Sequence, residues 1–275
     1  ELQWTHPTAI QRLVIPAALA GKDVIALAET GSGKTGAFAL PILQGLLTNP
    51  KRLSVLVLAP TRELAVQIHD VFQALGHSAG AKSVVIVGGV DTVAQAVALA
   101  KQPHIVVATP GRLLDMLEHT KGFNLRNLST LVMDEADRML SMDFEEELNR
   151  ILSAIPKERV TMLFSATMTS KVEKLQRASL RRGDSLVRVE VSKKYGTVST
   201  LDQKFILCPA VARDRYLAWL LSEFAGRSAI VFTATCSQAR RLSALLRHLG
   251  MEAFALHGQQ LQDARLSALN RFKAG

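Results

Sequence analysis

A repeated alternation of short β-branched runs with helical stretches most constrains how this chain can fold. In RELAVQIHDVFQAL, for example, apolar residues recur every three or four positions, as in an amphipathic helix that packs on a sheet. Runs that are apolar on both faces indicate a parallel sheet with helices on each side. The sequence therefore predicts an α/β fold, a parallel sheet flanked by helices. The predicted strands are DVIALA at 23, SVLVLA at 54, SVVIVGG at 83, HIVVATP at 104, STLVMDE at 129 and TMLFSAT at 161.

A change of pattern near residue 190 divides the chain. The segment VSKKYGTVST is polar, contains glycine and has no helical period. We interpret residues 191–200 as a linker between a first domain at 1–190 and a second domain at 201–275. In the second domain the alternation resumes, with QKFILC, SAIVFTA and MEAFALH as predicted strands. Its length of about 75 residues is below the roughly 100 to 150 residues of a usual α/β domain, so it is predicted to be incomplete.

The composition excludes several classes of protein. The chain has two cysteines, and no further cysteine or histidine stands near them at the spacing of metal ligands. We therefore expect neither a disulfide scaffold nor a zinc site. No apolar run approaches the roughly 20 residues that span a bilayer, and no signal peptide is visible. Lys and Arg exceed Asp and Glu by nine, which favours a polyanionic partner. Because both domains share the excess, any nucleic-acid surface is predicted to be distributed.

The segment AETGSGKT, residues 28–35, has the context of a phosphate-binding loop, since it follows a predicted strand and precedes a predicted helix. The glycines let backbone N–H groups turn toward an anion, Lys34 places a charge at the outer phosphates, and Thr35 offers a hydroxyl to Mg²⁺. An ordinary glycine-rich turn is the alternative, because Ala28 stands where the strict pattern has glycine. The nucleotide-binding residues predicted here are Thr30, Gly31, Ser32, Gly33, Lys34 and Thr35.

Three carboxylates crowd together in LVMDEADRML, residues 131–140, directly after an apolar run. Mutual repulsion and desolvation both oppose this arrangement unless a cation lies nearby. A strand that ends in Asp134, in the same sheet as a phosphate loop, can place this carboxylate beside a nucleotide's Mg²⁺. Glu135 is then free to orient or deprotonate the attacking water, and Asp137 can bond a neighbouring loop. Taken alone, the acids could equally stabilise a helix N-terminus.

Taken in order, these motifs resemble the DEAD-box family of ATP-dependent RNA helicases, over nearly the whole chain. PTAIQ at 7–11 resembles the family's adenine-sensing Q motif, and AETGSGKT and DEAD resemble its two nucleotide motifs. SAT at 165–167 resembles the motif that couples hydrolysis to domain movement. The resemblance assigns Gln11 to the adenine edge. It also implies catalytic roles for Lys34, Asp134, Glu135, Ser165, Thr167 and Asp137, with Ser165 and Thr167 meeting Asp137.

Further segments resemble the family's RNA-contacting loops, namely PTREL at 60–64, the glycine pair at 88–89 and TPGR at 109–112. PTREL and TPGR each offer a hydroxyl, a turn-forming residue and an arginine, which suits contact with phosphates and ribose without base reading. A solvated arginine at a helix start, or a plain glycine turn, is the alternative for each one alone. In the second domain, VFTAT at 231–235 and HGQQLQDAR at 257–265 resemble the family's early motifs of that domain. This resemblance also implicates Phe232 as a functional residue. The implied RNA-binding residues are Pro60, Thr61, Arg62, Gly88, Gly89, Thr109, Pro110, Gly111, Arg112, Gln262 and Arg265.

The resemblance implies tandem RecA-like domains, an ATP-binding domain at 1–190 and the first part of a C-terminal domain at 201–275. It implies an enzyme that hydrolyses ATP with Mg²⁺ to unwind short RNA duplexes or remodel RNA–protein complexes. GSGKTGAFALPIL and KGFNLRNLSTLVMDEADRML look most like the nucleolar branch that processes pre-ribosomal RNA. That likeness implies a soluble monomer in the nucleus and nucleolus, without membrane contact, that binds pre-ribosomal RNA and protein cofactors of ribosome assembly.

Two other functions are compatible with the same motifs. One is an ATP-gated RNA clamp that holds a ribonucleoprotein together, and duplex unwinding would separate it from a helicase. The other is a phosphate-loop ATPase that acts on DNA or protein, which the joint presence of PTAIQ, PTREL, TPGR and DEAD disfavours. Because nothing after Gly275 supplies the family's later motifs, including an arginine that reaches the γ-phosphate, the segment alone is predicted to be nearly inactive.

Overall fold

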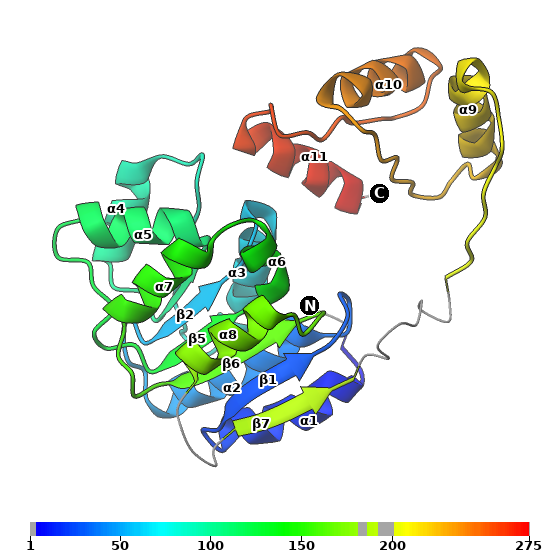
Figure 1. Ribbon diagram of the computed structural model, residues 1–275. Helices are drawn as coiled ribbons and strands as arrows, with labels where there is room; N and C mark the ends of the chain where they lie inside the picture. The colour runs from blue at the N-terminus through cyan, green and yellow to red at the C-terminus, as the bar shows by residue number, and fades with distance from the viewer. Residues whose placement is uncertain (1–3, 181–185, 192–200, 275) are drawn as a thin grey trace. The chain divides into compact units, whose positions relative to one another are not determined.

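The computed structural model describes residues 4–180, 186–191 and 201–274, which belong to two compact units, Glu1–Gly196 and Thr197–Gly275 (Figure 1). The predicted linker at 191–200 lies outside the described residues, apart from Val191. Within the described ranges, no helix is both long enough and apolar enough to cross a bilayer.

The first unit is built on a sheet of seven strands, all parallel, in the order β3-β4-β2-β5-β6-β1-β7 (Figure 1). Each of the six predicted runs coincides with one of the strands to within one residue at its start, so the predicted fold class is confirmed. The strands are β1 (Asp23–Leu27), β2 (Val55–Leu58), β3 (Ser83–Ile86), β4 (Ile105–Ala108), β5 (Thr130–Met133), β6 (Val160–Ser165) and β7 (Leu186–Glu190).

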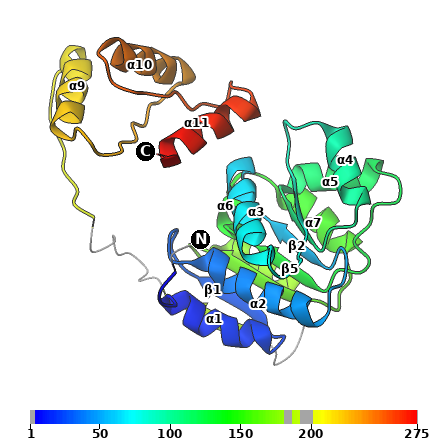
Figure 2. The same ribbon diagram turned by 180° about the vertical axis from the view of Figure 1, so that it is seen from behind.

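Helices cover both faces of this sheet, because successive residues of its central strands are buried on opposite sides. Val55 and Val57 of β2 belong to one core with α1, α2 and α3, the face turned to the viewer in Figure 2. Leu56 and Leu58 belong to a second core with α4 to α8. The helices are α1 (Ala9–Leu19), α2 (Lys34–Thr48), α3 (Arg62–Gly76), α4 (Thr92–Ala100), α5 (Pro110–His119), α6 (Ala136–Ser141), α7 (Glu145–Ala154) and α8 (Ser170–Ser179).

One strand corrects the sequence interpretation. The charged sequence RRGDSLVR at 181–188 by itself predicts a solvated loop, but Leu186, Val187 and Arg188 lie in β7, paired with β1 at the sheet edge. Val189 is buried, whereas its neighbours on either side are partly or fully exposed. An edge strand pairs with only one neighbour and can form with a weak apolar alternation. The charged residues directly before this strand therefore concealed the alternation in the sequence.

In its described residues the second unit contains helices joined by segments without regular secondary structure. They are α9 (Arg213–Glu223), α10 (Cys236–His248) and α11 (Gln262–Ala274), with a single 3-10 turn, η1 (Ala210–Ala212). The expectation of strands at QKFILC, SAIVFTA and MEAFALH is wrong, since no described residue there is in a strand. A parallel strand is stabilised by hydrogen bonds to neighbouring strands. Without such partners Phe205, Leu207 and Phe232 are more than 90% exposed.

The strands of the first unit begin at one edge of the sheet, where a buried histidine joins two loops. The Nδ1 atom of His104, before β4, accepts a hydrogen bond of 2.9 Å from the backbone N–H of Lys82, before β3. This bond requires a ring that is unprotonated at Nδ1. Burial lowers the pKa of His104 from its ordinary value, and the charges of Arg52 and Lys82 lower it further. The neutral imidazole is therefore the form that stabilises this edge.

We expect acid to destabilise the first unit through this histidine. The folded-state pKa of His104 lies below the unfolded value of about 6.5, so its contribution is complete above pH 6.5 and is lost as the pH falls below it. The measurement is the free energy of unfolding in denaturant at pH 7.5 and pH 5.5. His104→Asn keeps an acceptor but does not titrate, so it should reduce the pH dependence, whereas His6→Asn at an exposed site should not. Equal pH dependence in all three proteins would contradict this account.

Candidate functional site

Apart from PTAIQ, which precedes the first strand, the predicted motifs of the first unit lie at the carboxyl edge of the sheet, since each follows the end of a strand. Parallel strands end at the same edge, so segments far apart in the sequence become neighbours. The sheet order sorts them into two groups. The segments after β1, β5 and β6 carry the nucleotide motifs, and those after β2, β3 and β4 carry PTREL, the glycine pair and TPGR. Because β2 and β5 are paired, the two groups adjoin at the middle of the sheet.

The loop after β1 has the backbone of an anion-binding turn. Gly31 and Gly33 have φ values of +80° and +93°, which only glycine adopts readily. Ser32 closes the turn by donating its Oγ hydrogen to the carbonyl of Glu29, at 2.7 Å. The Lys34 side chain is only 6% exposed, and its Nζ donates to the carbonyl of Ala28 at 3.1 Å. The loop therefore holds a buried ammonium group at the start of α2, where the helix dipole also favours an anion.

Gln11 connects the start of α1 to this loop. Its Oε1 accepts from the N–H of Thr8 at 2.9 Å, which completes a capping box, and its Nε2 donates to the carbonyl of Gly33 at 3.1 Å. Space is tight here. A Cβ atom on Gly36 would lie 2.7 Å from Gln11 Nε2 and 3.0 Å from the indole of Trp4. The Q-motif segment is therefore packed directly against the phosphate loop and the first turn of α2.

Asp134, directly after β5, is an almost fully buried carboxylate with 3% exposure. Burial raises its pKa to about 6, and the Lys34 ammonium opposes this rise, so the two groups are electrostatically coupled. Glu135 and Asp137 raise the pKa further by repulsion. Asp134 Oδ1 accepts one hydrogen bond, of 3.0 Å, from the N–H of Glu135. A divalent cation in contact with Asp134 would favour its charged form, so the donor chemistry of this position fits Mg²⁺.

The other two DEAD carboxylates have separate partners. Glu135 has a left-handed backbone, with φ +51° and ψ +51°, and its Oε2 accepts from Arg138 at 3.2 Å. A non-glycine residue in this conformation is strained, as at many functional sites. Asp137 Oδ2 accepts from both the N–H and the hydroxyl of Thr167, at 3.0 and 2.7 Å. Ser165 is fully buried and donates to the carbonyl of Thr167 at 2.8 Å. The expected contact between SAT and DEAD is therefore present, through Thr167.

The predicted RNA loops also converge. The Arg62 guanidinium lies against Gly88, since a Cβ atom on Gly88 would come within 3.0 Å of its Nη2. Arg112 Nη1 donates to the carbonyl of Val90 at 3.3 Å and to the Thr92 hydroxyl at 3.0 Å. The two arginines thus flank the same loop, after β3. Pro60, Thr109 and Pro110 are buried, and Thr61, Gly89 and Gly111 are at least partly accessible.

One residue of this region was not anticipated. Gln95 of α4 is 4% exposed, and its amide bonds both backbone groups of Val87, accepting from the N–H at 2.9 Å and donating to the carbonyl at 3.1 Å. It also donates to the carbonyl of Val90 at 3.2 Å. Gln95 therefore fixes the loop that carries Gly88 and Gly89. A glutamine within the apolar sequence TVAQAVALA was the available signal.

Residues 8–175, more than half of the chain, match the DEAD/DEAH box helicase family. The chain belongs to this family. Similar proteins include "Probable ATP-dependent RNA helicase DDX47" of Homo sapiens, 59% identical over 274 residues. Another is "ATP-dependent rRNA helicase rrp3" of Sclerotinia sclerotiorum, 61% identical over 275 residues. Both comparisons cover 100% of this chain but only 60% and 56% of those proteins, so the chain spans less than two thirds of their length.

A solved structure with the same family name supports the membership. It is the crystal structure of a DEAD box protein from the hyperthermophile Methanococcus jannaschii, which is 33% identical to this chain with a TM-score of 0.63. The comparison covers 98% of this DEAD-box chain and 71% of that one.

The remaining predicted residues lie in the second unit. Phe232 is 92% exposed, Gln262 is buried at the start of α11, and Arg265 follows one turn later. Their assignment to RNA stays a prediction. In the described part of this DEAD-box chain, no three His, Cys, Asp or Glu residues are grouped so that they could hold a metal ion. A metal at the nucleotide motifs therefore depends on phosphate oxygens and water for most of its ligands.

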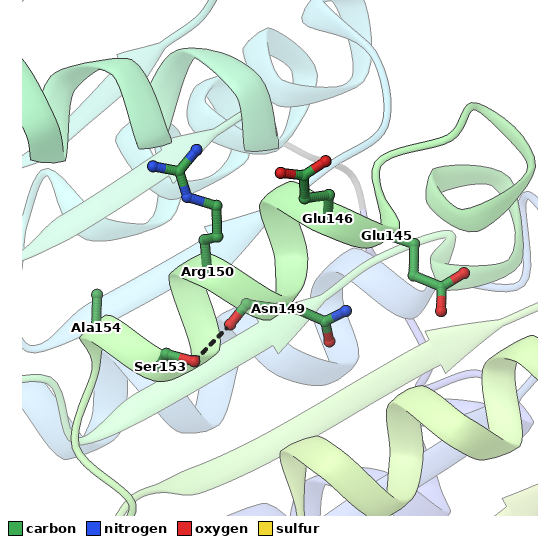
Figure 3. Close-up of a pocket in the computed structure, with 6 residues that line it drawn as sticks. All are labelled: Glu145, Glu146, Asn149, Arg150, Ser153 and Ala154. Atoms are coloured by element: carbon green, nitrogen blue, oxygen red, sulfur yellow. Dashed lines mark hydrogen bonds between the residues drawn. The ribbon is translucent and has the colours of Figure 1, made fainter.

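A depression on the outer face of α7 is unrelated to these motifs (Figure 3). Its lining residues all come from this one helix, and Ser153 there donates to the carbonyl of Asn149, within the helix. No predicted site residue lines it. The lining residues are Glu145, Glu146, Asn149, Arg150, Ser153 and Ala154.

We expect Gln95→Leu to destabilise this DEAD-box chain by about 1–3 kcal/mol, because buried backbone groups of Val87 would lose their partners. The measurement is the free energy of unfolding from denaturant titration. Gln44→Leu is the matched control, since Gln44 is exposed on α2 and should change stability by less than about 0.5 kcal/mol. Equal effects of the two substitutions would show that the Gln95 amide does not stabilise the loop.

Proposed function

We propose that this chain is the ATP- and RNA-binding part of an ATP-dependent RNA helicase that acts in ribosomal RNA processing. One observation carries the proposal. The sheet order brings the nucleotide-motif segments after β1, β5 and β6 next to the RNA-motif loops after β2, β3 and β4, on a single edge. A protein that couples nucleotide hydrolysis to RNA remodelling requires such adjacency. The names of the similar proteins, an ATP-dependent RNA helicase and an rRNA helicase, agree with this assignment.

ATP is the proposed nucleotide, and the residues of the β1 loop supply most of its binding. Lys34 is a buried cation that an anionic phosphate would stabilise. The backbone N–H groups of the glycine turn and the dipole of α2 favour an anion at the same place. Gln11, already anchored to Gly33, is the proposed contact of the adenine edge. Asp134 and Thr35 are the proposed holders of Mg²⁺, which when bound neutralises charge on the outer phosphates.

Glu135 is the proposed group that orients or deprotonates the attacking water. It lies next to Asp134, and its left-handed backbone departs from both strand and helix geometry. Asp137 holds Thr167 by two hydrogen bonds, so any movement of the DEAD segment would be transmitted to the segment after β6. This linkage is the proposed route from hydrolysis to domain movement.

RNA is the proposed second ligand, held by Arg62, Arg112 and the loop of Gly88 and Gly89. These side chains offer guanidinium groups and small residues, and TPGR and PTREL add hydroxyls, so phosphate and ribose contacts without sequence selection are expected. In the proposed cycle, ATP and RNA both favour a closed arrangement of the two domains, so each should tighten binding of the other. The closed state would bend one strand, and hydrolysis would reopen it.

The proposed setting is pre-ribosomal RNA processing in the nucleus and nucleolus. The support is the name of the rrp3 relative and the 61% identity over 275 residues. A soluble monomer that recruits protein cofactors of ribosome assembly belongs to the same proposal.

The proposal predicts that single-stranded RNA stimulates ATP hydrolysis, whereas DNA of the same sequence does so far less, because ribose hydroxyls contribute to binding. The measurement is steady-state ATPase activity with each nucleic acid, for this chain and for a full-length counterpart. Stimulation by DNA equal to that by RNA would overturn the assignment of RNA. If neither chain turned over ATP while the longer one bound RNA only with ATP, an RNA clamp would replace the helicase.

In the full-length counterpart, Glu135→Gln should lower kcat by about 10²–10⁴-fold and leave ATP and RNA affinity nearly unchanged, because the amide keeps the size of the side chain but is not a base. The measurements are single-turnover ATP hydrolysis and equilibrium binding of a fluorescent ATP analogue. Glu173→Gln, at an exposed position on α8, is the matched control and should leave both unchanged. Loss of nucleotide binding in Glu135→Gln would show that this carboxylate is structural.

A further inference from the structure

The amino edge of the sheet, opposite the candidate site, concentrates the positive charge of the first unit. Six loops lead into β1 to β6 there, at residues 20–22, 49–54, 77–82, 101–104, 120–129 and 155–159. Together they contain nine of the 33 Lys and Arg residues of the chain, but only one of its 24 Asp and Glu residues. These loops therefore have a net charge of +8, whereas the other residues of the first unit comprise 14 Lys and Arg and 18 Asp and Glu, a net charge of −4.

Most of these charges are accessible. The exposed cations define what we call the amino-edge basic surface, and the exposed acid among them is Glu158. None of the eight side chains forms an ion pair with another described residue. The amino-edge basic surface consists of Lys22, Lys51, Arg52, Lys82, Lys101, Lys121, Arg126 and Lys157.

The loops that carry these cations are fixed to one another. The carbonyl of Ser54 accepts from the N–H groups of Ser129 and Thr130 at 2.9 and 3.0 Å, and the carbonyl of Lys82 accepts from His104 at 2.8 Å. Arg52 donates to the carbonyl of Gln102 at 3.0 Å. The positive potential is felt locally, since the charges of Arg52 and Lys82 lower the pKa of His104 beyond the effect of burial. The surface is therefore a preorganised row of charges.

Helix dipoles alone do not account for this row. Six helices end at the same edge, and each contributes about half a negative charge, which offsets roughly three positive charges. The exposed side chains of the loops carry a net charge of +7, eight cations less Glu158, which is more than twice what the dipoles offset. The dipole effect also fades within the last turn, yet seven of the eight cations lie two or more residues beyond the end of their helix, and Lys101 alone is a C-cap.

The arrangement of the charges fits a nucleic-acid backbone. Adjacent strands are about 4.8 Å apart, so six of them spread the loops over about 24 Å, which is the length of on the order of seven phosphates of one duplex strand. Six of the eight cations are lysines, which bind phosphate as point charges. The one Phe, Tyr or Trp residue of these loops is Phe123, which is buried, so stacking on bases is not available.

We propose that the amino-edge basic surface binds the phosphate backbone of RNA as a second contact, on the opposite edge of the sheet from the motif loops. The choice of RNA rests on the proposed function. β6 has six residues, so the two edges are about 20 Å apart. An RNA that only fills the motif loops does not reach the surface, whereas a longer RNA does. Binding there is independent of sequence and of nucleotide.

The test compares two variants of the chain that lose the same charge. Lys22, Lys51, Lys82 and Lys157, each replaced by Gln, remove four charges from the surface, and their side chains make no hydrogen bond to another described residue. The control replaces Lys171, Arg213, Arg215 and Lys273 by Gln, all of them exposed elsewhere. Affinity is measured for an RNA of about 40 nucleotides without ATP, over a range of salt, and for an RNA of about 6 nucleotides with a non-hydrolysable ATP analogue.

We expect the first variant to bind the long RNA at least about tenfold more weakly, and the slope of log affinity against log salt to shrink by about 3. Its affinity for the short RNA should not change, and the control should bind both RNAs like the parent chain. Equal loss in both variants would reduce the effect to net charge and overturn the proposal. Unchanged long-RNA binding would also overturn it and leave an acidic protein as the partner to examine. Failure of the short RNA to bind would instead count against the proposed function.

Discussion

Parallel pairing of the seven strands is the constraint on which the rest of this structure depends. Because every ladder is parallel, all carboxyl ends meet at one edge and all amino ends at the other. Ladder bonds continue into the motifs themselves. The N–H of Asp134 donates to Leu58, at the end of β2, and the N–H of Ala28 donates to Ser165, at the end of β6. The sheet therefore sets the positions of the catalytic candidates directly.

The charged residues at the carboxyl edge differ in how far they are buried, and therefore in their electrostatics. Lys34 and Asp134 are both nearly removed from water, and burial raises the pKa of Asp134 to about 6 in spite of the lysine. Such a pair remains costly until an anion meets the lysine and a cation meets the carboxylate. Glu135 and Asp137 keep more contact with solvent. The ligand that satisfies this site best therefore brings both charges together, as a metal-bound polyphosphate does.

The sequence predicted those features of the fold and site that depend on neighbouring residues, and missed those that depend on residues far apart in the chain. The phosphate loop and DEAD are each specified by neighbouring residues, so strand, loop and helix could be predicted in order. The partner of Thr167 came from family resemblance, because 30 residues separate it from Asp137. Local signals failed where stability depends on partners. A weak apolar alternation became β7 because β1 pairs with it, whereas the stronger apolar run SAIVFTA has no paired strand among the described residues. The role of Gln95 likewise follows only from the folded loop.

The distribution of basic residues also differs between the sequence and the folded structure. Counted along the sequence, the basic excess is shared between the domains, and we expected a distributed surface. The sheet instead collects single lysines from loops such as those before β1, β3 and β6 into one row. This separation has a mechanistic consequence for RNA. Contacts at the carboxyl edge lie beside the nucleotide motifs and should change when ATP is bound or hydrolysed, whereas contacts at the amino edge adjoin no nucleotide motif. A chain that uses both edges can release the strand it has remodelled and still remain on the same RNA.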